Sequence, residues 1–152
     1  MKFKDIFEGN NSAYGQLILT GEVTEKGKAK GKAFIKREPI PVQFWEDHLE
    51  GKDPALGVIP INEQNMCRWG CIDVDEYTGL DHLSIMRDIK GFGFPLVTFR
   101  SKSGGAHLFL FTKEFIPAAL MQLKLKAMSE ALGFSGSEIF PKQTEILVER
   151  GD

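Results

Sequence analysis

From position 68 onward, hydrophobic and polar residues recur in a pattern that predicts six elements in the order strand, helix, strand, strand, helix, strand. Their expected ranges are 68–74, 80–90, 95–100, 107–112, 117–132 and 138–148. The expected strands are short apolar runs bounded by turn-forming residues, and the expected helices place apolar residues at helical spacing. This βαββαβ order is found in ferredoxin-like and RNA-recognition-motif (RRM-like) folds, so the pattern predicts an α+β fold.

The first third of the chain is rich in turn-forming residues and predicts shorter elements. Strands are expected at 16–22, 31–37 and 56–61, and a helical turn at 44–49. The lysine–glycine segment 25–32 lies between the first two strands and predicts a β-hairpin. We therefore expect a small N-terminal α/β accessory lobe over residues 1–66 and an RRM-like module over residues 67–152.

The overall charge of the chain gives no sign of nucleic-acid binding. Its 152 residues carry a formal net charge of −2, so any contact with nucleic acid must come from a local basic patch. The one dense basic run consists of Lys26, Lys28, Lys30, Lys32, Lys36 and Arg37. Such a run contacts a nucleic-acid backbone or, more often, forms a solvated hairpin tip, and the solvated tip is the favoured interpretation.

The two cysteines indicate a reducing compartment. Cys67 and Cys71 are expected to be free thiols, because no secretory segment is visible. Together with His82 and His107 they do not match the spacing of a structural zinc site. No apolar run approaches the roughly 20 residues that cross a bilayer. We expect a cytoplasmic protein without membrane contact.

Asp73 and Asp75 are the first candidates for chemistry. They flank Val74 at the point where the predicted strand 68–74 gives way to a loop, so an extended backbone places both carboxylates on the same face. Paired carboxylates repel each other unless a cation lies between them, and their oxygen atoms suit Mg²⁺ or Mn²⁺. The alternative is a solvated strand end, with Asp75 or Asp81 capping the next helix.

The segment from Arg100 to His107 has the composition of a phosphate-binding turn. Its candidate nucleotide-binding residues are Arg100, Lys102, Ser103, Gly104, Gly105 and His107. Glycine-rich turns expose backbone N–H groups, and the charged and hydroxyl side chains add donors for phosphate oxygens. The alternative is a plain hairpin whose two glycines need positive φ. The predicted fold makes the strands of Asp73 and His107 neighbours, which favours a shared cleft.

Glu138 and Lys142 complete the set of candidates. Glu138 opens the last predicted strand and can supply a third carboxylate, while Lys142 can pair with phosphate. The alternative is an ordinary surface strand with exposed charges.

At these segments the sequence resembles the archaeo-eukaryotic primase superfamily, and most of all the primase-polymerases of phages and mobile elements, including TOTE conflict-system primases. The matching segments are 67–75, 100–108 and 138–143, and the resemblance extends back to 48–49 and 57–60. It implies catalytic roles for Asp73, Asp75 and His107, with Mg²⁺ or Mn²⁺ held by the two aspartates and Glu138. One position departs from the family motif: Gly105 stands where the motif often has serine.

The resemblance implies a DNA primase or DNA polymerase core that transfers nucleotides by a two-metal mechanism. Its implied partners are nucleoside triphosphates, a single-stranded DNA template and a helicase. Relatives usually continue beyond this length, so we expect the second module to be truncated at its C-terminus. Two other functions stay open: a non-catalytic RRM-like module that binds nucleic acid, and a nuclease that uses the same carboxylates with water as the nucleophile.

Overall fold

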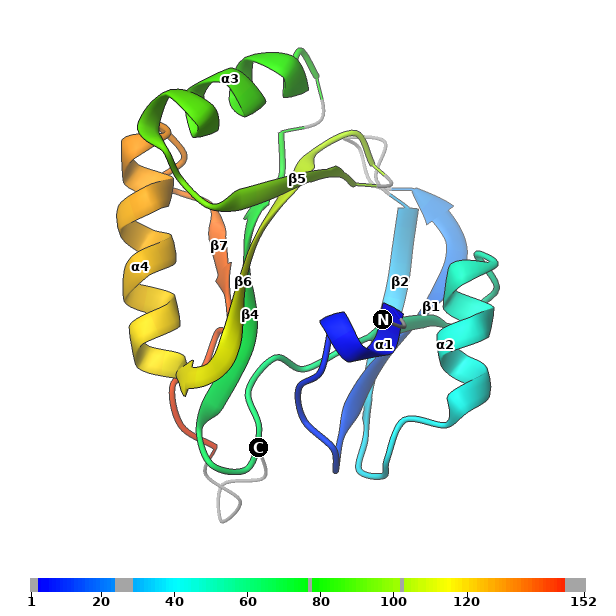
Figure 1. The fold of residues 1–152 in the computed structure, drawn as a ribbon. Coiled ribbons are helices and arrows are strands. Elements are labelled where there is room, and N and C mark those ends of the chain that lie inside the picture. The colour runs from blue at the N-terminus through cyan, green and yellow to red at the C-terminus, as the bar shows by residue number, and fades with distance from the viewer. Residues whose placement is uncertain (1–2, 24–28, 77, 102, 147–152) are drawn as a thin grey trace.

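A computed structural model describes residues 3–23, 29–76, 78–101 and 103–146. The described chain forms two antiparallel sheets, each with its own helices (Figure 1). The first part comprises α1 (Phe3–Ile6), β1 (Tyr14–Val23), β2 (Ala29–Lys36), α2 (Val42–Leu49) and β3 (Ala55–Gly57). The second part comprises β4 (Met66–Val74), α3 (His82–Phe92), β5 (Leu96–Arg100), β6 (Ala106–Pro117), α4 (Ala118–Ala131) and β7 (Glu138–Phe140).

The strands of the first sheet are arranged β2–β1–β3. β1 and β2 form the predicted hairpin, of which Lys26 and Lys28 lie outside the described residues. The pattern does not predict α1, because a helix of 4 residues is too short to show a periodicity. β3 ends at Gly57, earlier than predicted, since the backbone oxygen of Ile59 accepts a hydrogen bond from Asn10 N (2.8 Å) outside the sheet.

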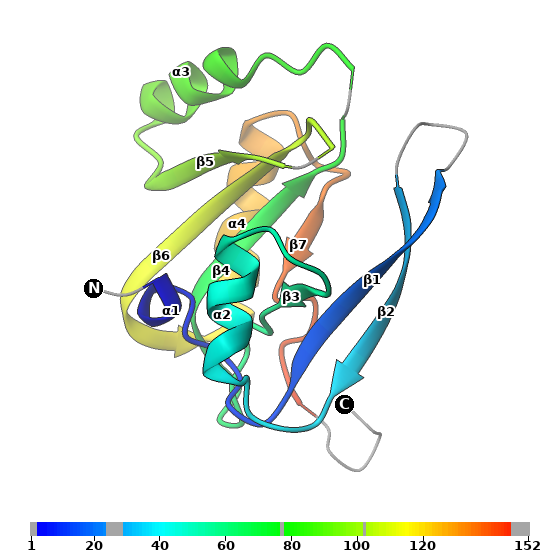
Figure 2. The same cartoon turned by 90° about the vertical axis from the view of Figure 1, so that its right-hand side faces the viewer.

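The second part has the predicted order of elements, and its strands are arranged β5–β6–β4–β7 with every neighbouring pair antiparallel. α3 and α4 lie on one side of this sheet and the first part of the chain lies on the other (Figures 1 and 2). β7 is shorter than predicted, because Pro141 has no N–H to continue the ladder. Residues 147–148 of the expected strand lie outside the described residues.

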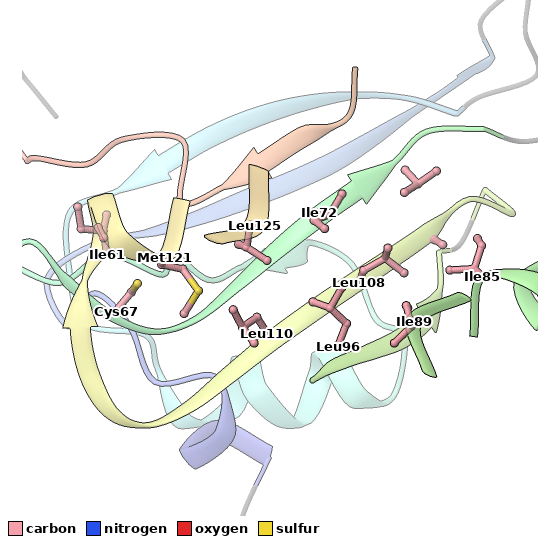
Figure 3. Packing of buried hydrophobic residues seen from close by; sticks show 13 residues of the cluster. Ile61, Cys67, Ile72, Ile85, Ile89, Leu96, Leu108, Leu110, Met121 and Leu125 are labelled. Carbon is pink, nitrogen blue, oxygen red and sulfur yellow. The ribbon is translucent and has the colours of Figure 1, made fainter. Parts of the chain in front are cut away.

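The hydrophobic core lies between the second sheet and its two helices (Figure 3). Its buried side chains include Ile72 and Val74 from β4, Leu96 from β5, Leu108 and Leu110 from β6, Ile85 and Ile89 from α3, and Met121 and Leu125 from α4. Gly70 allows α4 to approach β4 closely. A Cβ atom at this position would lie 2.6 Å from Leu125 Cδ1 and 2.6 Å from the backbone oxygen of Phe140.

Both helices of the second part have well-defined ends. Asp81 caps α3, because its carboxylate accepts hydrogen bonds from Leu83 N and Ser84 N, both at 3.0 Å. Of the two residues predicted as possible caps, Asp81 therefore caps the helix and Asp75 does not. α4 ends before Gly133, which adopts the expected left-handed conformation (φ 82°). None of the described helices combines the length and apolar character needed to cross a bilayer.

We predict that Gly70→Ala lowers the free energy of unfolding by about 1–3 kcal/mol, because the added methyl group overpacks the contact between β4 and α4. Gly91→Ala is the matched control: its new Cβ would meet nothing within 4 Å in α3, so stability should rise by about 0.5–1 kcal/mol. Urea denaturation followed by circular dichroism measures both changes. Equal effects of the two substitutions would contradict the packing argument.

Candidate active site

A cleft of about 440 Å³ lies between the two parts of the chain. The first part lines it with Phe3, Phe7, Trp45, His48, Leu56 and Val58. The second sheet lines it, on the face opposite α3 and α4, with Trp69, Cys71, Asp73, Phe99, Arg100, His107, Phe109 and Phe140. Most of this lining is aromatic or aliphatic. Asp73, Arg100 and His107 bring polar chemistry to the sheet side.

Residues just after α1 hold the first part of the chain against the sheet. Arg68 Nη1 donates a hydrogen bond to Glu8 Oε2 at 2.9 Å, and Trp69 Nε1 donates to the backbone oxygen of Glu8 at 3.0 Å. Phe7 packs edge-on against Trp69 and against Phe109, with ring centroids 5.3 Å apart in each pair. The dimensions of the cleft therefore depend on residues that the sequence pattern did not identify.

Asp73 occupies the centre of a row of three polar side chains that crosses the second sheet. His107 on β6 and Glu138 on β7 lie directly opposite Asp73 in the two strand pairs. Directly opposite residues share a face of the sheet, so the three side chains lie on the cleft side. His107 Nε2 and Asp73 Oδ1 are 3.3 Å apart. The predicted proximity of Asp73 and His107 is confirmed.

The acidic residues line a second cavity of about 330 Å³ beside the cleft. Asp73, Asp75, Glu76 and Glu138 contribute to its wall, so Asp73 belongs to both cavities. Asp75 follows the last residue of β4, which ends at Val74 as predicted. The cavity brings the two aspartates and Glu138 to one place.

Two carboxylates of the acidic cavity each have a basic partner. Glu138 Oε1 lies 3.0 Å from Lys142 Nζ, and this ammonium group lies 5.1 Å from the centre of the Phe140 ring. The pair is exposed, so it contributes little to stability. Asp73 contacts His107 instead. Among the residues that the structure describes, no three His, Cys, Asp or Glu side chains are close enough together to hold a metal ion by themselves.

The turn between β5 and β6 is closed by two backbone hydrogen bonds. Ser101 N donates to Gly105 O at 2.9 Å, and Gly104 N donates to Ser101 O at 3.0 Å. Gly104 has a φ of 95°, which favours glycine. Gly105 is required for a different reason, because a Cβ atom there would lie 2.3 Å from the backbone oxygen of Val74. The expectation of positive φ is confirmed for Gly104 and wrong for Gly105.

The other candidates in this segment take different positions. Arg100 ends β5 and contributes to the cleft lining, while its neighbour Phe99 lies directly opposite His107. Ser103 is exposed in the turn. Lys102 lies outside the described residues. The structure therefore brings His107 into contact with Asp73 and Arg100 into the lining of the same cleft, and Glu138 joins Lys142 to the acidic cavity.

Residues 3–149 match the family model described as TOTE conflict system, Archaeo-Eukaryotic Primase domain. The chain belongs to this family. The matched range contains both sheets and every residue that lines the cleft, so the candidate site lies within the archaeo-eukaryotic primase domain. The resemblance seen in the sequence is confirmed. A search of curated proteins finds no match to the chain.

In this primase domain, His82 connects the start of α3 to the glycine-rich turn. Its Nε2 atom donates a hydrogen bond to Gly105 O at 3.0 Å. The same oxygen accepts the hydrogen bond from Ser101 N that closes the turn. No sequence signal identifies this role, because the partner is a backbone atom 23 residues away. The sequence indicated His82 only as a rejected zinc ligand.

The two thiols of the primase domain are free and buried in the folded state. Burial raises the pKa of Cys67 to about 11. Burial, followed by the nearby charge of Asp73, raises the pKa of Cys71. The thiolate is the reactive form, so both thiols are poor nucleophiles near neutral pH.

We predict that neither cysteine reacts with Ellman's reagent at a pH of about 8 in the native protein, and that both react in urea. Because the folded state holds these protons more tightly than the unfolded state, the free energy of unfolding should fall as the pH rises above the ordinary thiol pKa of 9.0. Absorbance at the wavelength of the released thiolate measures the first effect and denaturation at alkaline pH the second. Rapid labelling of the native protein would contradict the burial.

Proposed function

We propose that this chain is the catalytic core of a primase-polymerase, which transfers nucleotides from NTPs or dNTPs along a single-stranded DNA template. The observation that supports this most is the position of Asp73 on the wall shared by the cleft and the acidic cavity. Arg100 and His107 line the cleft together with Asp73, and Asp75 and Glu138 line the acidic cavity together with it. A nucleoside triphosphate needs this combination, because its phosphates require donors and metal ions while its base requires an apolar surface.

The acidic cavity suits a divalent metal ion by the chemistry of its donors. Carboxylate oxygens are preferred ligands of Mg²⁺ and Mn²⁺. Mg²⁺ is usually held by one or two carboxylates and completes its coordination with water and substrate phosphates, so a cluster of three side chains is not required. Asp73 and Asp75 would hold the ion, with Glu138 as a further ligand. When bound, the metal lowers the pKa of the attacking hydroxyl group and neutralises phosphate charge.

The residues of the cleft bind and orient the nucleotide. Arg100 and His107 donate hydrogen bonds to phosphate oxygens, and Lys142 adds a cation at the rim, with Lys102 and Ser103 as further donors from the turn. During transfer, a bond forms between the hydroxyl oxygen and the α-phosphorus, the bond to the bridging oxygen breaks, and pyrophosphate leaves. The proton of the hydroxyl group passes to solvent. Donors already in place stabilise the charge that develops on the leaving phosphates.

We also infer that residues 67–152 form an RRM-like catalytic module and that residues 1–66 form its accessory lobe. The strand arrangement β5–β6–β4–β7, with both helices on one side, supports this classification because it leaves the other face open for substrate. The first part of the chain then provides the second wall of the cleft.

We predict that Asp73→Asn weakens binding of a nucleoside triphosphate with Mn²⁺ by at least about 10- to 100-fold, because a metal ligand loses its charge. Asp88→Asn is the matched control. It makes the same change of charge on the exposed surface of α3 and should bind as the wild type does. Isothermal titration calorimetry measures both. Equal binding by Asp73→Asn and the wild type would overturn the assignment of the metal site.

Primer extension on a DNA template tests the transfer itself. The wild type should lengthen the primer, while Asp73→Asn should keep its fold and leave the primer unchanged. Shortening of the DNA in the absence of nucleotide would favour the nuclease. Oligonucleotide binding without any binding of nucleotide would favour the non-catalytic module.

We predict that His82 is a positioning residue for the turn. His82→Ala removes the donor to Gly105 O, so the KM for nucleotide should rise about 2- to 10-fold, the value of one hydrogen bond, with a smaller change in kcat. His82→Gln can place an amide nitrogen near the position of Nε2 and should restore most of the affinity. Steady-state kinetics separate the two constants, and equal damage by alanine and glutamine would contradict the role of the hydrogen bond.

A further inference from the structure

Strand β2 carries a row of lysines on one of its faces. Lys30, Lys32 and Lys36 are separated by even numbers of residues, so their side chains leave the strand on the same side. Phe34 lies between Lys32 and Lys36 on this side and is 45% exposed. We call this side of β2, with the residues opposite it on β1, the lysine face. It alternates positive charge with exposed aromatic surface.

The lysine face is continuous with the wall of the cleft. Phe34 is directly opposite Gln16 on β1, and Gln16 is directly opposite Leu56 on β3. Directly opposite residues share a face of a sheet, so these three side chains form a row across all three strands. Leu56 lines the cleft. The hairpin also extends toward the end of the molecule that carries the turn between β5 and β6 (Figures 1 and 2).

The lysine face suits an anionic partner. Within the described part of the chain, neither Lys32 nor Lys36 forms an ion pair, whereas Lys30 Nζ lies 3.2 Å from Glu22 Oε2. Ile18, directly opposite Lys32, is 47% exposed and adds apolar surface between the charges. The whole chain has a net charge of −2, so this positive charge is a local feature and not part of a general basic field.

We propose that the lysine face binds single-stranded nucleic acid and guides the template strand into the cleft, a role that rests on the proposed polymerase function. Alternate residues of a strand lie about 7 Å apart, a spacing comparable to that of successive phosphates in an extended single strand. Exposed Phe34 and Ile18 offer stacking and apolar surface to unpaired bases, as in grooves that bind single strands. The bases of a duplex are stacked inside it, so a duplex would contact the lysine charges but not the apolar surface of Phe34 and Ile18.

Fluorescence anisotropy of a labelled oligothymidylate, titrated over a range of salt concentrations, tests the proposal on the intact chain. In Lys32→Ala/Lys36→Ala, two phosphate contacts are lost, so the slope of log K against log salt should become shallower by about 1.4. In Phe34→Ala, the affinity should fall roughly 5- to 100-fold with an unchanged slope, because stacking is lost and charge is not. Thermal denaturation checks that each variant is folded.

The matched control is Lys90→Ala/Lys124→Ala. It removes the same charge from exposed positions on α3 and α4, on the far side of the second sheet, and should leave the slope unchanged. The proposal is overturned if the wild type does not bind the oligonucleotide or if the two double variants change the salt slope by the same amount. It is also overturned if a duplex binds more tightly than the single strand and Phe34→Ala has no effect.

Calorimetry with nucleotide and Mn²⁺ on the same variants separates this inference from the proposed function. Suppose that the wild type binds nucleotide and that Lys32→Ala/Lys36→Ala leaves oligonucleotide binding unchanged. This result overturns the role proposed for the lysine face and leaves the proposed function standing. Absence of nucleotide binding in the wild type overturns the proposed function. If Lys32→Ala/Lys36→Ala still binds nucleotide but has a shallower salt slope for the oligonucleotide, the result supports both the proposed function and the role of the lysine face.

Discussion

The packing of β4 is the constraint on which both the core and the candidate site depend. Its residues alternate between two environments: Gly70 and Ile72 face α4, whereas Trp69, Cys71 and Asp73 face the cleft. A shift of register by one residue would exchange the two faces, placing a carboxylate in the core and an aliphatic side chain in the cleft. Gly70 tightens the constraint, because no larger residue fits between β4 and α4 without movement.

The first part of the chain turns this sheet face into a cleft. Without it, the rings of Trp69 and Phe109 would be exposed to water, which is unfavourable for large apolar surfaces. Phe7 covers these rings, and Glu8 fixes its position through two hydrogen bonds to the sheet. Partial enclosure also lowers the local dielectric around Asp73, so its interactions with nearby charges become stronger than they would be in open water.

Much of the second part of the fold could be predicted, because hydrophobic spacing is a local property of the chain. The order of elements followed from that spacing, and the proximity of Asp73 and His107 followed from the order. Gly104 in the turn and Asp81 at the start of α3 were also predicted from local signals. Gly105, however, is needed for close packing against Val74 and not for a positive φ. The ends of strands were predicted less well, as β3 shows by ending at Gly57 and not at Ile61, because a strand stops where its hydrogen-bond partners stop.

By itself, the sequence determined which segments form strands and helices, which residues of β4 are apolar, and which side chains could serve as metal or phosphate ligands. Only the tertiary structure decided that Phe7 closes the cleft, that His82 supports the turn, and that Phe34 lies on the same face as a residue of the cleft wall. These contacts join residues far apart in the chain. They leave no periodic pattern in the sequence, because they depend on how whole elements pack against one another.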